Sequence, residues 1–489
     1  MKSVRIFFVL ILAAVVVFLG PQFAAYVKTR DAIPPGVTLG GMNIGGATTA
    51  AAVANLRQVF ETPILVYHAN KRLLLRPEQI EFRIGAEAMV AEAQNYSRGL
   101  YYLRDFVFYL LDQPAIGRDV PLRFDYDRAK LGAWLQEQAE AYDNDPTPAY
   151  AKLDTLQFAP GQPGRYTDLD DSAVQIIKAL SSPYNREARM AIHEQPPLPP
   201  TRATLEAALR QRMERFSGIY ALYYQDLSTG DEIDVDADTA FAGMSTVKIP
   251  ILLKLYYDRD LPLDPSTSRW VSETVKSETA SNAGANALLY RIGGEDTLTG
   301  ARRVTDFMRG LGYQNTFIAV PYDSDLTPPH IATPANTNPA YNTFPDPAMQ
   351  TTPGDIGKVL ADIGHCAEGG GNLLAALAPR LTPAKCQELI GWLEQNPMGF
   401  LIRYGVPKGT RVAHKHGYGS DSQGDVALIY GPEGPYVLSI YVFQSGWVIW
   451  NHSNPLMNDL SRLVWNYYLA RQGKEQLPPF DPNDKNRGG

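Results

Sequence analysis

A short stretch in the middle of the chain combines the residue types that nucleophilic catalysis needs. Ser245 and Lys248 stand three residues apart in AFAGMSTVKIPILLKLYY (240–257), where we expect an apolar helix to begin. At that spacing, the hydroxyl and the amine lie on one face of a helix, one turn apart. A lysine in apolar surroundings loses its proton readily and serves as a base for a neighbouring hydroxyl. The spacing therefore predicts a serine nucleophile with a lysine base.

Two further stretches offer groups that could hold a substrate beside that hydroxyl. Residues 412–443 predict three strands, and the first strand with its turn carries a lysine, a histidine and two glycines: Lys415, His416, Gly417 and Gly419. Glycine lets a ligand lie close to a strand edge, where an ammonium group binds a carboxylate. Asn282 precedes a predicted helix, and by itself such an asparagine is equally expected as a helix cap.

Turn and periodicity signals predict the elements that position these residues. A helix is expected over 201–213, followed by two strands, 218–227 and 232–241, joined by a Ser-Thr-Gly-Asp hairpin turn. Ahead of them, EQPPLPP is a proline run of the kind that stays extended and semi-rigid. The predicted parts of the chain are an N-terminal anchor (1–28), an α+β domain (34–193), a linker (194–200), a second domain (201–471) and a disordered tail (472–489).

The order of these motifs resembles that of the class A β-lactamases and related penicillin-binding proteins. The resemblance extends over 201–471 and includes Thr351-Thr352-Pro353, which is similar to the family's Thr-Thr-containing helix. It implies an α+β, multidomain chain whose second domain is a β-lactamase-like α/β sandwich, an antiparallel sheet flanked by helices. It also implies an acyl-enzyme mechanism on β-lactams or D-Ala-D-Ala-like peptides of the peptidoglycan stem, with no cofactor and no metal.

The resemblance assigns a role to each candidate residue. Ser245 would be the nucleophile and Lys248 its base, with the backbone N–H of Ser245 in the oxyanion hole. Asn282 would hold the amide side chain of the substrate. The far wall of the cleft would be lined by Lys415, with a catalytic role, and by His416, Gly417 and Gly419, with binding roles.

Three departures from the family pattern bear on turnover. Ala280 stands where the family has a serine that relays a proton to the leaving nitrogen, and neither Thr279 nor Ser281 is in that register. His416 replaces the usual hydroxyl residue and should narrow the cleft. No glutamate occurs between residues 313 and 351, where class A enzymes keep the base that deacylates the enzyme. These departures favour a penicillin-binding or peptidase-like activity over rapid destruction of antibiotics.

The first domain carries a second resemblance. GVTLGGMNIGGATTAAAVANL (36–56) is similar to the opening of the peptidoglycan-binding domains found beside VanW-type proteins, and GQPGRYTDLDDSAVQIIKAL (161–180) is similar to their closing strand, turn and helix. Thr48-Thr49 and the acidic group at Asp168 are predicted N-caps of helices. The resemblance implies binding to the cell wall but assigns no ligand contacts.

The N-terminus predicts the location of the chain. Two basic residues, Lys2 and Arg5, precede the apolar run IFFVLILAAVVVFLG (6–20). Extended to Val27, the run approaches the roughly 20 residues of a membrane span, and no clean cleavage site follows it. We expect a signal anchor with an extracytoplasmic domain, in preference to a cleaved secretory signal.

Composition excludes several classes of protein. Lys+Arg is 45 and Asp+Glu is 52, a net charge of -7 that argues against a nucleic-acid partner. Two cysteines, Cys366 and Cys386, rule out a disulfide-rich scaffold and a multi-cysteine metal site. Outside the cytoplasm these two could form a disulfide or remain as buried thiols.

Two hypotheses of different classes follow. The first is a membrane-anchored serine hydrolase that acts through an acyl-enzyme at Ser245. The second is a non-catalytic, peptidoglycan-binding protein that keeps the fold and has lost turnover, which the alanine at 280 and the missing glutamate favour.

Overall fold

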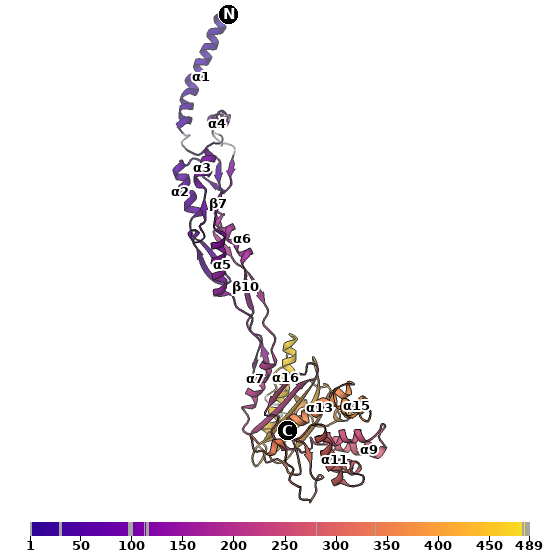
Figure 1. Ribbon diagram of the computed structural model, residues 1–489. Coiled ribbons are helices and arrows are strands. Elements are labelled where there is room, and N and C mark those ends of the chain that lie inside the picture. The colour runs from indigo at the N-terminus through magenta and orange to yellow at the C-terminus, as the bar shows by residue number, and fades with distance from the viewer. Residues whose placement is uncertain are drawn as a thin grey trace. The chain divides into compact units, whose positions relative to one another are not determined.

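The chain forms two compact units in the computed structural model (Figure 1). The structure describes residues 2–28, 32–95, 101–111, 113, 117–279, 281–337, 339–481 and 484. The first unit comprises 1–147 and 162–196, and the second comprises 148–161 and 197–489. The chain therefore passes between the units three times.

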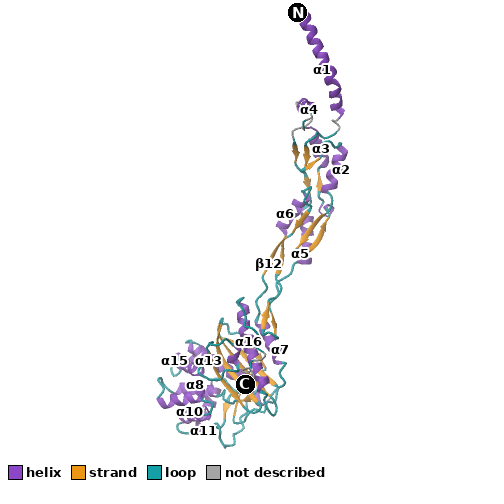
Figure 2. Cartoon of the chain, turned by 180° about the vertical axis from the view of Figure 1, so that it is seen from behind, coloured by secondary structure: helices purple, strands orange, loops and turns teal. Residues whose placement is uncertain are grey.

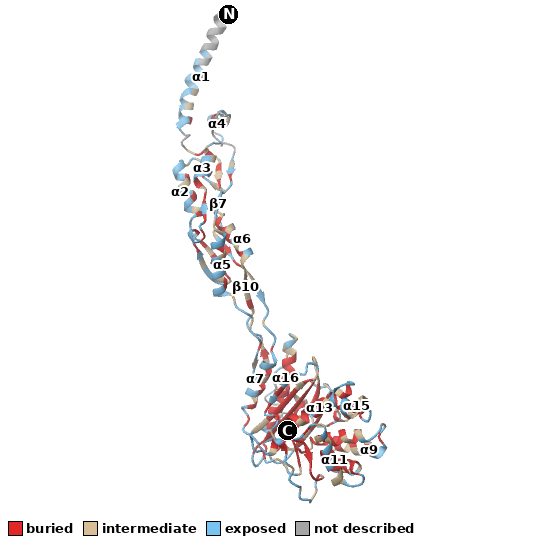
Figure 3. Cartoon of the chain, viewed as in Figure 1, coloured by how far each residue is buried: buried red, intermediate tan, exposed pale blue. Residues whose placement is uncertain are grey.

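A five-stranded antiparallel sheet organises the second unit, with the strand order β14-β13-β20-β19-β18. Its strands are β13 (Ile219–Asp226), β14 (Glu232–Val235), β18 (Val412–Tyr418), β19 (Ser422–Gly431) and β20 (Gly434–Phe443). A smaller sheet combines β15 (Phe241–Ala242), β17 (Met349–Thr351) and β16 (Phe317–Ile318). The predicted hairpin at 228–231 joins β13 to β14. The central strands are buried, as Figure 3 shows.

Helices cover both faces of the large sheet, because successive side chains of each strand point to opposite faces. Leu222 and Tyr224 of β13 join a cluster with α7 and α16, whereas Ala221 joins a second cluster with α8, α10 and α13. Figure 2 shows the two sets of helices on either side of the sheet. The helices of this unit are α7 (Arg202–Met213), α8 (Lys248–Asp258), α9 (Pro265–Lys276), α10 (Ser281–Gly293), α11 (Thr297–Gly310), α12 (Pro334–Thr337), α13 (Pro353–Ala367), α14 (Gly371–Leu377), α15 (Pro383–Leu393) and α16 (Trp450–Arg471).

Local sequence explains where several of these helices begin. Thr201 caps α7 by accepting from the backbone of Thr204, and Thr352 caps α13 by accepting from Asp355. Proline at the first position of α13 suits a helix start, because its missing N–H would have no intrahelical partner there. The sandwich of a sheet between helices agrees with the predicted architecture.

Cys366 of α13 and Cys386 of α15 form a disulfide. Both residues are fully buried within the cluster that lies on the α8 face of the sheet. Of the two alternatives that the sequence left open, the structure shows the bonded pair.

The segment 148–161 belongs to the second unit, although the sequence placed it inside a first domain of 34–193. It forms the hairpin β8 (Tyr150–Lys152) and β9 (Gln157–Ala159). Leu156 and Phe158 of this hairpin are buried in the cluster with α7 and α16. The burial of these two apolar side chains explains why the hairpin departs from its neighbours in the sequence.

The described part of the C-terminal tail packs against the second unit, so the prediction of a wholly disordered tail from 472 is wrong. Gln476 and Phe158 exchange two hydrogen bonds, at 2.6 and 2.7 Å. The ring of Phe480 stacks on Tyr404 with centroids 5.7 Å apart, and the Arg462 guanidinium lies 4.0 Å from the Phe480 centroid. Residues 482, 483 and 485–489 of the predicted tail lie outside the described residues.

The first unit is a mixed α+β arrangement of short strands and amphipathic helices. Thr48 and Asp168 cap α2 and α6, as predicted from the sequence. One sheet has the order β2-β1-β6 and another the order β11-β3-β4, with β10 paired to β12 and β5 to β7. The elements are β1 (Val37–Leu39), β2 (Met42–Asn43), α2 (Thr49–Phe60), β3 (Ile64–His68), β4 (Lys71–Leu75), β5 (Arg83–Ile84), α3 (Ala86–Asn95), α4 (Tyr101–Leu110), β6 (Arg118–Val120), β7 (Phe124–Asp125), α5 (Arg128–Tyr142), β10 (Gly164–Asp168), α6 (Leu169–Leu180), β11 (Glu187–Arg189) and β12 (Ala191–Gln195).

The predicted anchor coincides with a helix, α1 (Lys2–Lys28). Side chains at 2–9, 11 and 12 of this helix lie outside those that the structure describes. Among the described residues, no helix combines the length and the apolar character needed to cross a membrane.

Candidate active site

Ser245 lies in a tight turn between β15 and α8. The helix begins at Lys248, three residues later than the sequence suggested, so the serine precedes the helix instead of forming its first turn. Backbone bonds from Thr246 to the Gly243 carbonyl and from Lys248 to the Ser245 carbonyl, at 3.2 and 3.3 Å, close the turn. Met244 just before the serine has a φ of 50°, a left-handed conformation that bends the chain sharply at this point.

Buried hydroxyl groups fix the shape of this turn. The Thr246 hydroxyl donates to the Gly243 carbonyl at 2.6 Å and accepts from the Tyr441 hydroxyl at 2.5 Å. The Tyr322 hydroxyl donates to the Met244 carbonyl at 2.8 Å. The turn is thereby held by the sheet on one side and by the loop that carries Tyr322 on the other.

The Lys248 amine lies at the centre of a cluster of three oxygen atoms. Its Nζ lies 2.8 Å from Ser245 Oγ, 2.9 Å from Ser281 Oγ and 2.8 Å from Asn282 Oδ1. The side chain is fully buried, and Nζ lies 4.6 Å from the centroid of the Tyr322 ring. Burial, and then the charge of Lys415, lower the pKa of Lys248 to about 7, although Asp323 acts in the opposite direction. Near neutral pH, a large share of this amine is therefore in the neutral, basic form.

Asp323 orients the amide of Asn282. The Asn282 Nδ2 donates to both carboxylate oxygens of Asp323, each at 3.1 Å, which turns Oδ1 towards Lys248. Asn286, one turn along α10, exchanges two hydrogen bonds with the backbone of Tyr322, at 2.9 and 3.0 Å. The start of α10 is thereby joined to the loop that carries Asp323.

Strand β18 passes close to the nucleophile turn at Gly417. A Cβ added to Gly417 would lie 2.7 Å from Met244 Cβ and 2.8 Å from the Ser245 nitrogen. A Cβ on Gly419 would meet its nearest neighbour, the Ser422 carbonyl, at 3.9 Å, which is an ordinary contact. The close approach therefore requires glycine at 417 and not at 419.

The backbone of β18 also presents a donor on its outer side. β18 is the last strand in the order of the sheet, and the Gly419 N–H donates to the Ser422 carbonyl at 2.8 Å. Because N–H groups alternate in direction along a strand, the N–H of Tyr418 points away from β19. The backbone nitrogen of Ser245 lies beside the same stretch of strand.

Lys415 is almost completely buried, and its Nζ donates to the His416 carbonyl at 3.0 Å. Burial lowers the pKa of Lys415 to about 8, against the opposing effect of the Asp425 carboxylate. Burial, and then the charge of Lys415, lower the pKa of His416 to about 3, so its imidazole is neutral at physiological pH. Of these two neighbouring residues, Lys415 is thus the charged one.

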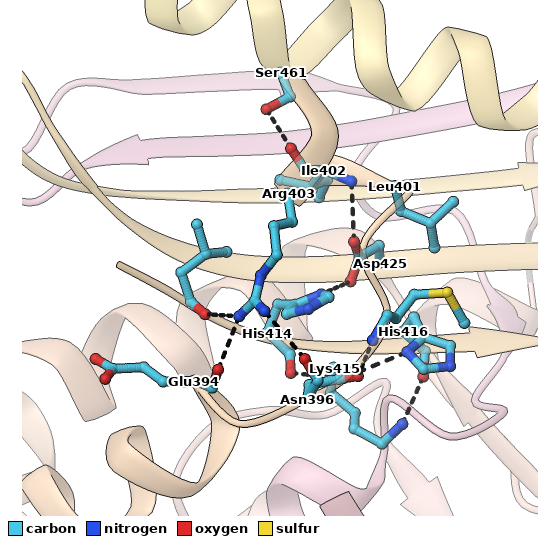
Figure 4. A network of polar contacts seen from close by, with 12 residues as sticks. Glu394, Asn396, Leu401, Ile402, Arg403, His414, Lys415, His416, Asp425 and Ser461 are labelled. Atoms are coloured by element: carbon cyan, nitrogen blue, oxygen red, sulfur yellow. Dashed lines mark hydrogen bonds and ion pairs between the residues drawn. The ribbon is translucent and has the colours of Figure 1, made fainter. Parts of the chain in front are cut away.

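A network of polar contacts supports β18 from behind (Figure 4). Asn396 donates to the His414 carbonyl at 3.0 Å and lies 3.3 Å from His416 Nδ1, while its Oδ1 accepts from the Met398 backbone at 3.1 Å. Because an amide nitrogen only donates, His416 Nδ1 is the acceptor and Nε2 carries the ring proton. Asn396 thereby fastens the loop at 396–401 to the strand.

Asp425 of β19 is the buried carboxylate of the same network. It accepts from His414 Nδ1 at 3.0 Å and from the Ile402 backbone at 3.2 Å. Burial acts to raise the pKa of Asp425, but the charge and hydrogen bond of His414 outweigh it and hold the pKa below its ordinary value. The Arg403 guanidinium belongs to the same network. It donates to three backbone carbonyls, those of Glu394, Asn396 and Val412.

These groups surround a cavity of about 500 Å³. Ser245, Lys248, Ser281 and Asn282, from the turn before α8 and from α8 and α10, line one wall, and Lys415 and His416, from β18, line a second wall. A row of aromatic rings continues the second wall. His416 stacks on Tyr418 with centroids 6.0 Å apart, and Tyr418 meets the edge of Trp450 at 5.7 Å. Tyr418 and Trp450 are 54% and 41% exposed, so this row faces solvent beside the cavity.

The structure brings together most of the residues singled out from the sequence, since Ser245, Lys248, Asn282, Lys415 and His416 all line one cavity. Gly417 lies against the nucleophile turn, whereas Gly419 belongs to the turn after the strand. Ala280 lies outside the described residues.

Sequence reasoning missed the contacts made by Asp323, Asn396, Asp425 and Trp450. The two tryptophans of the apolar stretch Trp-Val-Ile-Trp at 447–450 are the sequence signal that could have indicated Trp450. No comparable local signal marks the other three, because their partners are distant in the sequence.

Comparisons with known proteins address the identity of the chain. The family model described as "Beta-lactamase enzyme family" matches residues 204–261 and 279–468, more than half of the chain. The chain belongs to this family. It is a serine β-lactamase-like hydrolase, with Ser245 and Lys248 inside the first matched stretch. A second model, described as "Putative peptidoglycan binding domain", matches residues 75–189.

The chain is also similar to individual proteins of known sequence or structure. Beta-lactamase 3 of Bacillus cereus is 28% identical over 260 residues, which cover 48% of this chain and 71% of the relative. Among solved structures, PBP-A is 18% identical with a TM-score of 0.41, covering 56% of this chain and 98% of its own. A β-lactamase from Desulfarculus baarsii DSM 2075 is 20% identical with a TM-score of 0.41, covering 54% and 97%.

Proposed function

We propose that this member of the family forms an acyl-enzyme at Ser245 with β-lactams or with D-Ala-D-Ala-like peptides. The observation that carries the proposal is the 2.8 Å contact between Lys248 Nζ and Ser245 Oγ, made by a fully buried amine whose pKa is lowered to about 7. A neutral amine at that distance accepts the hydroxyl proton as Oγ attacks the substrate carbonyl.

The other residues of the cavity have complementary roles in this proposal. The backbone N–H groups of Ser245 and Tyr418 would stabilise the oxyanion that develops on the carbonyl oxygen. Lys415 would bind the substrate carboxylate, with the neutral His416 donating through Nε2. The Asn282 amide would hold the substrate amide, in the orientation that Asp323 imposes on it.

Slow deacylation is part of the proposal. The loop that follows Tyr313 holds no glutamate up to Thr351, and its Asp323 is engaged by Asn282. With no carboxylate assigned to activate a water molecule, the acyl-enzyme should persist. A long-lived acyl-enzyme is typical of a penicillin-binding activity, not of rapid antibiotic hydrolysis.

Labelling with a fluorescent penicillin tests the proposal. The full chain should become covalently labelled, and Ser245→Ala should abolish the label. As a matched control, Ser266→Ala removes a serine hydroxyl from the first turn of α9 and should leave labelling unchanged. Wild-type protein that stays unlabelled at high probe concentration would reject the acyl-enzyme.

The match of residues 75–189 to a peptidoglycan-binding model supports a second function, attachment to the cell wall. We propose that the first unit binds peptidoglycan and that the chain is held outside the cytoplasm by its N-terminal segment. The disulfide is consistent with an oxidising compartment. The full chain should sediment with purified sacculi, and Ser245→Ala should sediment equally. If the wild-type chain stays in the supernatant, cell-wall binding is rejected while the acylation result stands.

A further inference from the structure

The row of rings beside the cavity has side chains to which the mechanism above gives no role. From His416 the row passes to Tyr418, with an interplanar angle of 8° and centroids 6.0 Å apart, and then to Trp450 at 5.7 Å. All three residues line the cavity. Tyr418 and Trp450 are exposed, although each offers a large apolar area. Their open faces are therefore available to a bound substrate.

The surroundings of the two exposed rings indicate what they can contact. Among the described residues that line the cavity, full charges are confined to Lys248, Glu278 and Lys415. Lys248 of α8 and Glu278, between α9 and α10, belong to other elements than the rings. Met398 and Phe400, from the loop at 396–401, add apolar surface to the lining. A group that binds against the rings should be uncharged and apolar, because a buried charge without a partner is costly.

Hydrogen bonds hold the row in place from several sides. The N–H of Val448, two residues before Trp450, donates to the Ser420 carbonyl at 2.8 Å. Gln423 of β19 donates through Nε2 to Asn454 Oδ1 of α16, also at 2.8 Å. The end of the strand pair and the start of α16 are thereby joined beside the rings. A surface that is ordered in advance loses little conformational entropy when a ligand binds.

The position of the carboxylate decides which half of a substrate meets the row. In penicillins, cephalosporins and D-Ala-D-Ala, the carboxylate is carried by the carbon bonded to the nitrogen that leaves the carbonyl. We call this part the nitrogen half and the remainder the acyl half. Lys415 would bind the carboxylate of the nitrogen half, and the row begins at the next residue, His416. The acyl half would be held through its amide by Asn282 of α10.

We propose that Tyr418 and Trp450 form a subsite for a flat, apolar group carried on the nitrogen half of the substrate, an assignment that rests on the acyl-enzyme proposed above. A terminal D-alanine ends at its methyl group and its carboxylate, so it would reach His416 and leave both exposed rings uncovered. A nitrogen half that continues as an aromatic or other flat group would stack on them. The preferred substrates of this chain are accordingly those with an enlarged nitrogen half.

Two cephalosporins that differ only in the nitrogen half test the subsite. Nitrocefin carries a dinitrostyryl group on the ring carbon next to the one that bears the carboxylate, and cephalothin carries an acetoxymethyl group there. Both have the same thienylacetyl group on the acyl half. The acylation rate constant divided by the dissociation constant is measured on the full chain, for nitrocefin from its colour change and for cephalothin by competition with nitrocefin.

Trp450→Ala should lower the nitrocefin-to-cephalothin ratio of this quantity about 10-fold, and Trp450→Phe, which keeps a ring, should retain most of it. Trp447→Ala is the matched control, because Trp447 is more exposed than Trp450 and is not among the described residues that line the cavity. The ratio in this control should equal that of the wild-type chain. Trp450→Gln gives the same comparison if the alanine variant does not fold.

An unchanged ratio in Trp450→Ala would overturn the subsite. Equal slowing of both compounds would mean that the ring contacts the shared acyl half or serves only the fold, and no slowing of either would mean that it contacts neither. Failure of the acyl-enzyme looks different, because the wild-type chain would then react with neither compound, and the subsite would be rejected with it.

Discussion

Gly417 of β18 lies so close to the nucleophile turn that a Cβ at this position would be 2.8 Å from the backbone nitrogen of Ser245. The neighbouring atoms are backbone and the Met244 Cβ, none of which belongs to the flexible end of a side chain. The distance between the two walls of the cavity is therefore set at this point by the absence of a side chain.

Gly417→Ala should displace Ser245 relative to Lys248 and reduce the acylation rate about 10²-fold, the effect of a displacement near 1 Å. The rate constant is measured by stopped-flow labelling with a fluorescent penicillin. Gly391→Ala is the matched control, because it adds the same methyl group on α15 with no atom within 4 Å. A Gly417→Ala protein that acylates at the wild-type rate would show that the two walls can separate without loss of function.

The pH dependence of acylation should be bell-shaped, with its maximum between about 7 and 8. Lys248 acts as a base only when neutral, so the rate rises as pH rises through its pKa of about 7. Lys415 binds a carboxylate only when charged, so the rate falls as pH rises through its pKa of about 8. The acylation rate constant divided by the substrate dissociation constant, measured from pH 5 to 10, reports both limbs.

Lys415→Arg supplies the control for the alkaline limb, because a guanidinium keeps its charge throughout this range. The acid limb should then remain near pH 7, and the alkaline limb should disappear. An alkaline limb that persists in this variant would assign the limb to another group.

The cavity and its surroundings were predictable from sequence to different degrees. Lys415 and Gly417 were found because a lysine followed two residues later by a glycine lies on a predicted strand, and Ser245 because an apolar helix follows it. Asp323 and Asn396 were not found, because their roles depend on hydrogen bonds to residues far along the chain. Such contacts arise from tertiary packing and leave no local pattern.

The contact between Ser281 and Lys248 shows a similar limit. Compared by position with the family motif, Ser281 is out of register, whereas the structure places its Oγ 2.9 Å from Lys248 Nζ. Alignment compares positions along the sequence, but a contact depends on the distance between atoms. The domain boundary was misplaced for a related reason, since hydrophobic burial and not proximity in sequence assigns 148–161 to the second unit.

Asp425→Asn should shift the alkaline limb of the pH profile to lower pH. The Asp425 carboxylate stabilises the protonated form of Lys415, so its removal lowers the pKa of Lys415 further. The same pH series of acylation rates detects the shift. Glu394→Gln is the control, because Glu394 pairs with Arg411 at 2.7 Å and belongs to the outer part of the network in Figure 4. An unchanged alkaline limb in Asp425→Asn would show that solvent screens this buried charge from Lys415.

Phe158→Ala should destabilise the catalytic unit even though residue 158 lies in the sequence before the linker. The Phe158 side chain is 3% exposed, and its ring lies 6.1 Å from that of Tyr467 on α16. Loss of a buried phenylalanine leaves a cavity and costs about 3–5 kcal/mol of the free energy of unfolding.

Thermal inactivation of penicillin labelling at Ser245 reports the stability of the catalytic unit specifically. The midpoint temperature of this inactivation should be lower for Phe158→Ala than for the wild-type chain. Tyr150→Ala, on the same hairpin but 53% exposed, should leave the midpoint nearly unchanged. Equal midpoints for the wild-type and Phe158→Ala proteins would mean that the hairpin is dispensable, and a chain beginning at residue 197 should then fold and become labelled.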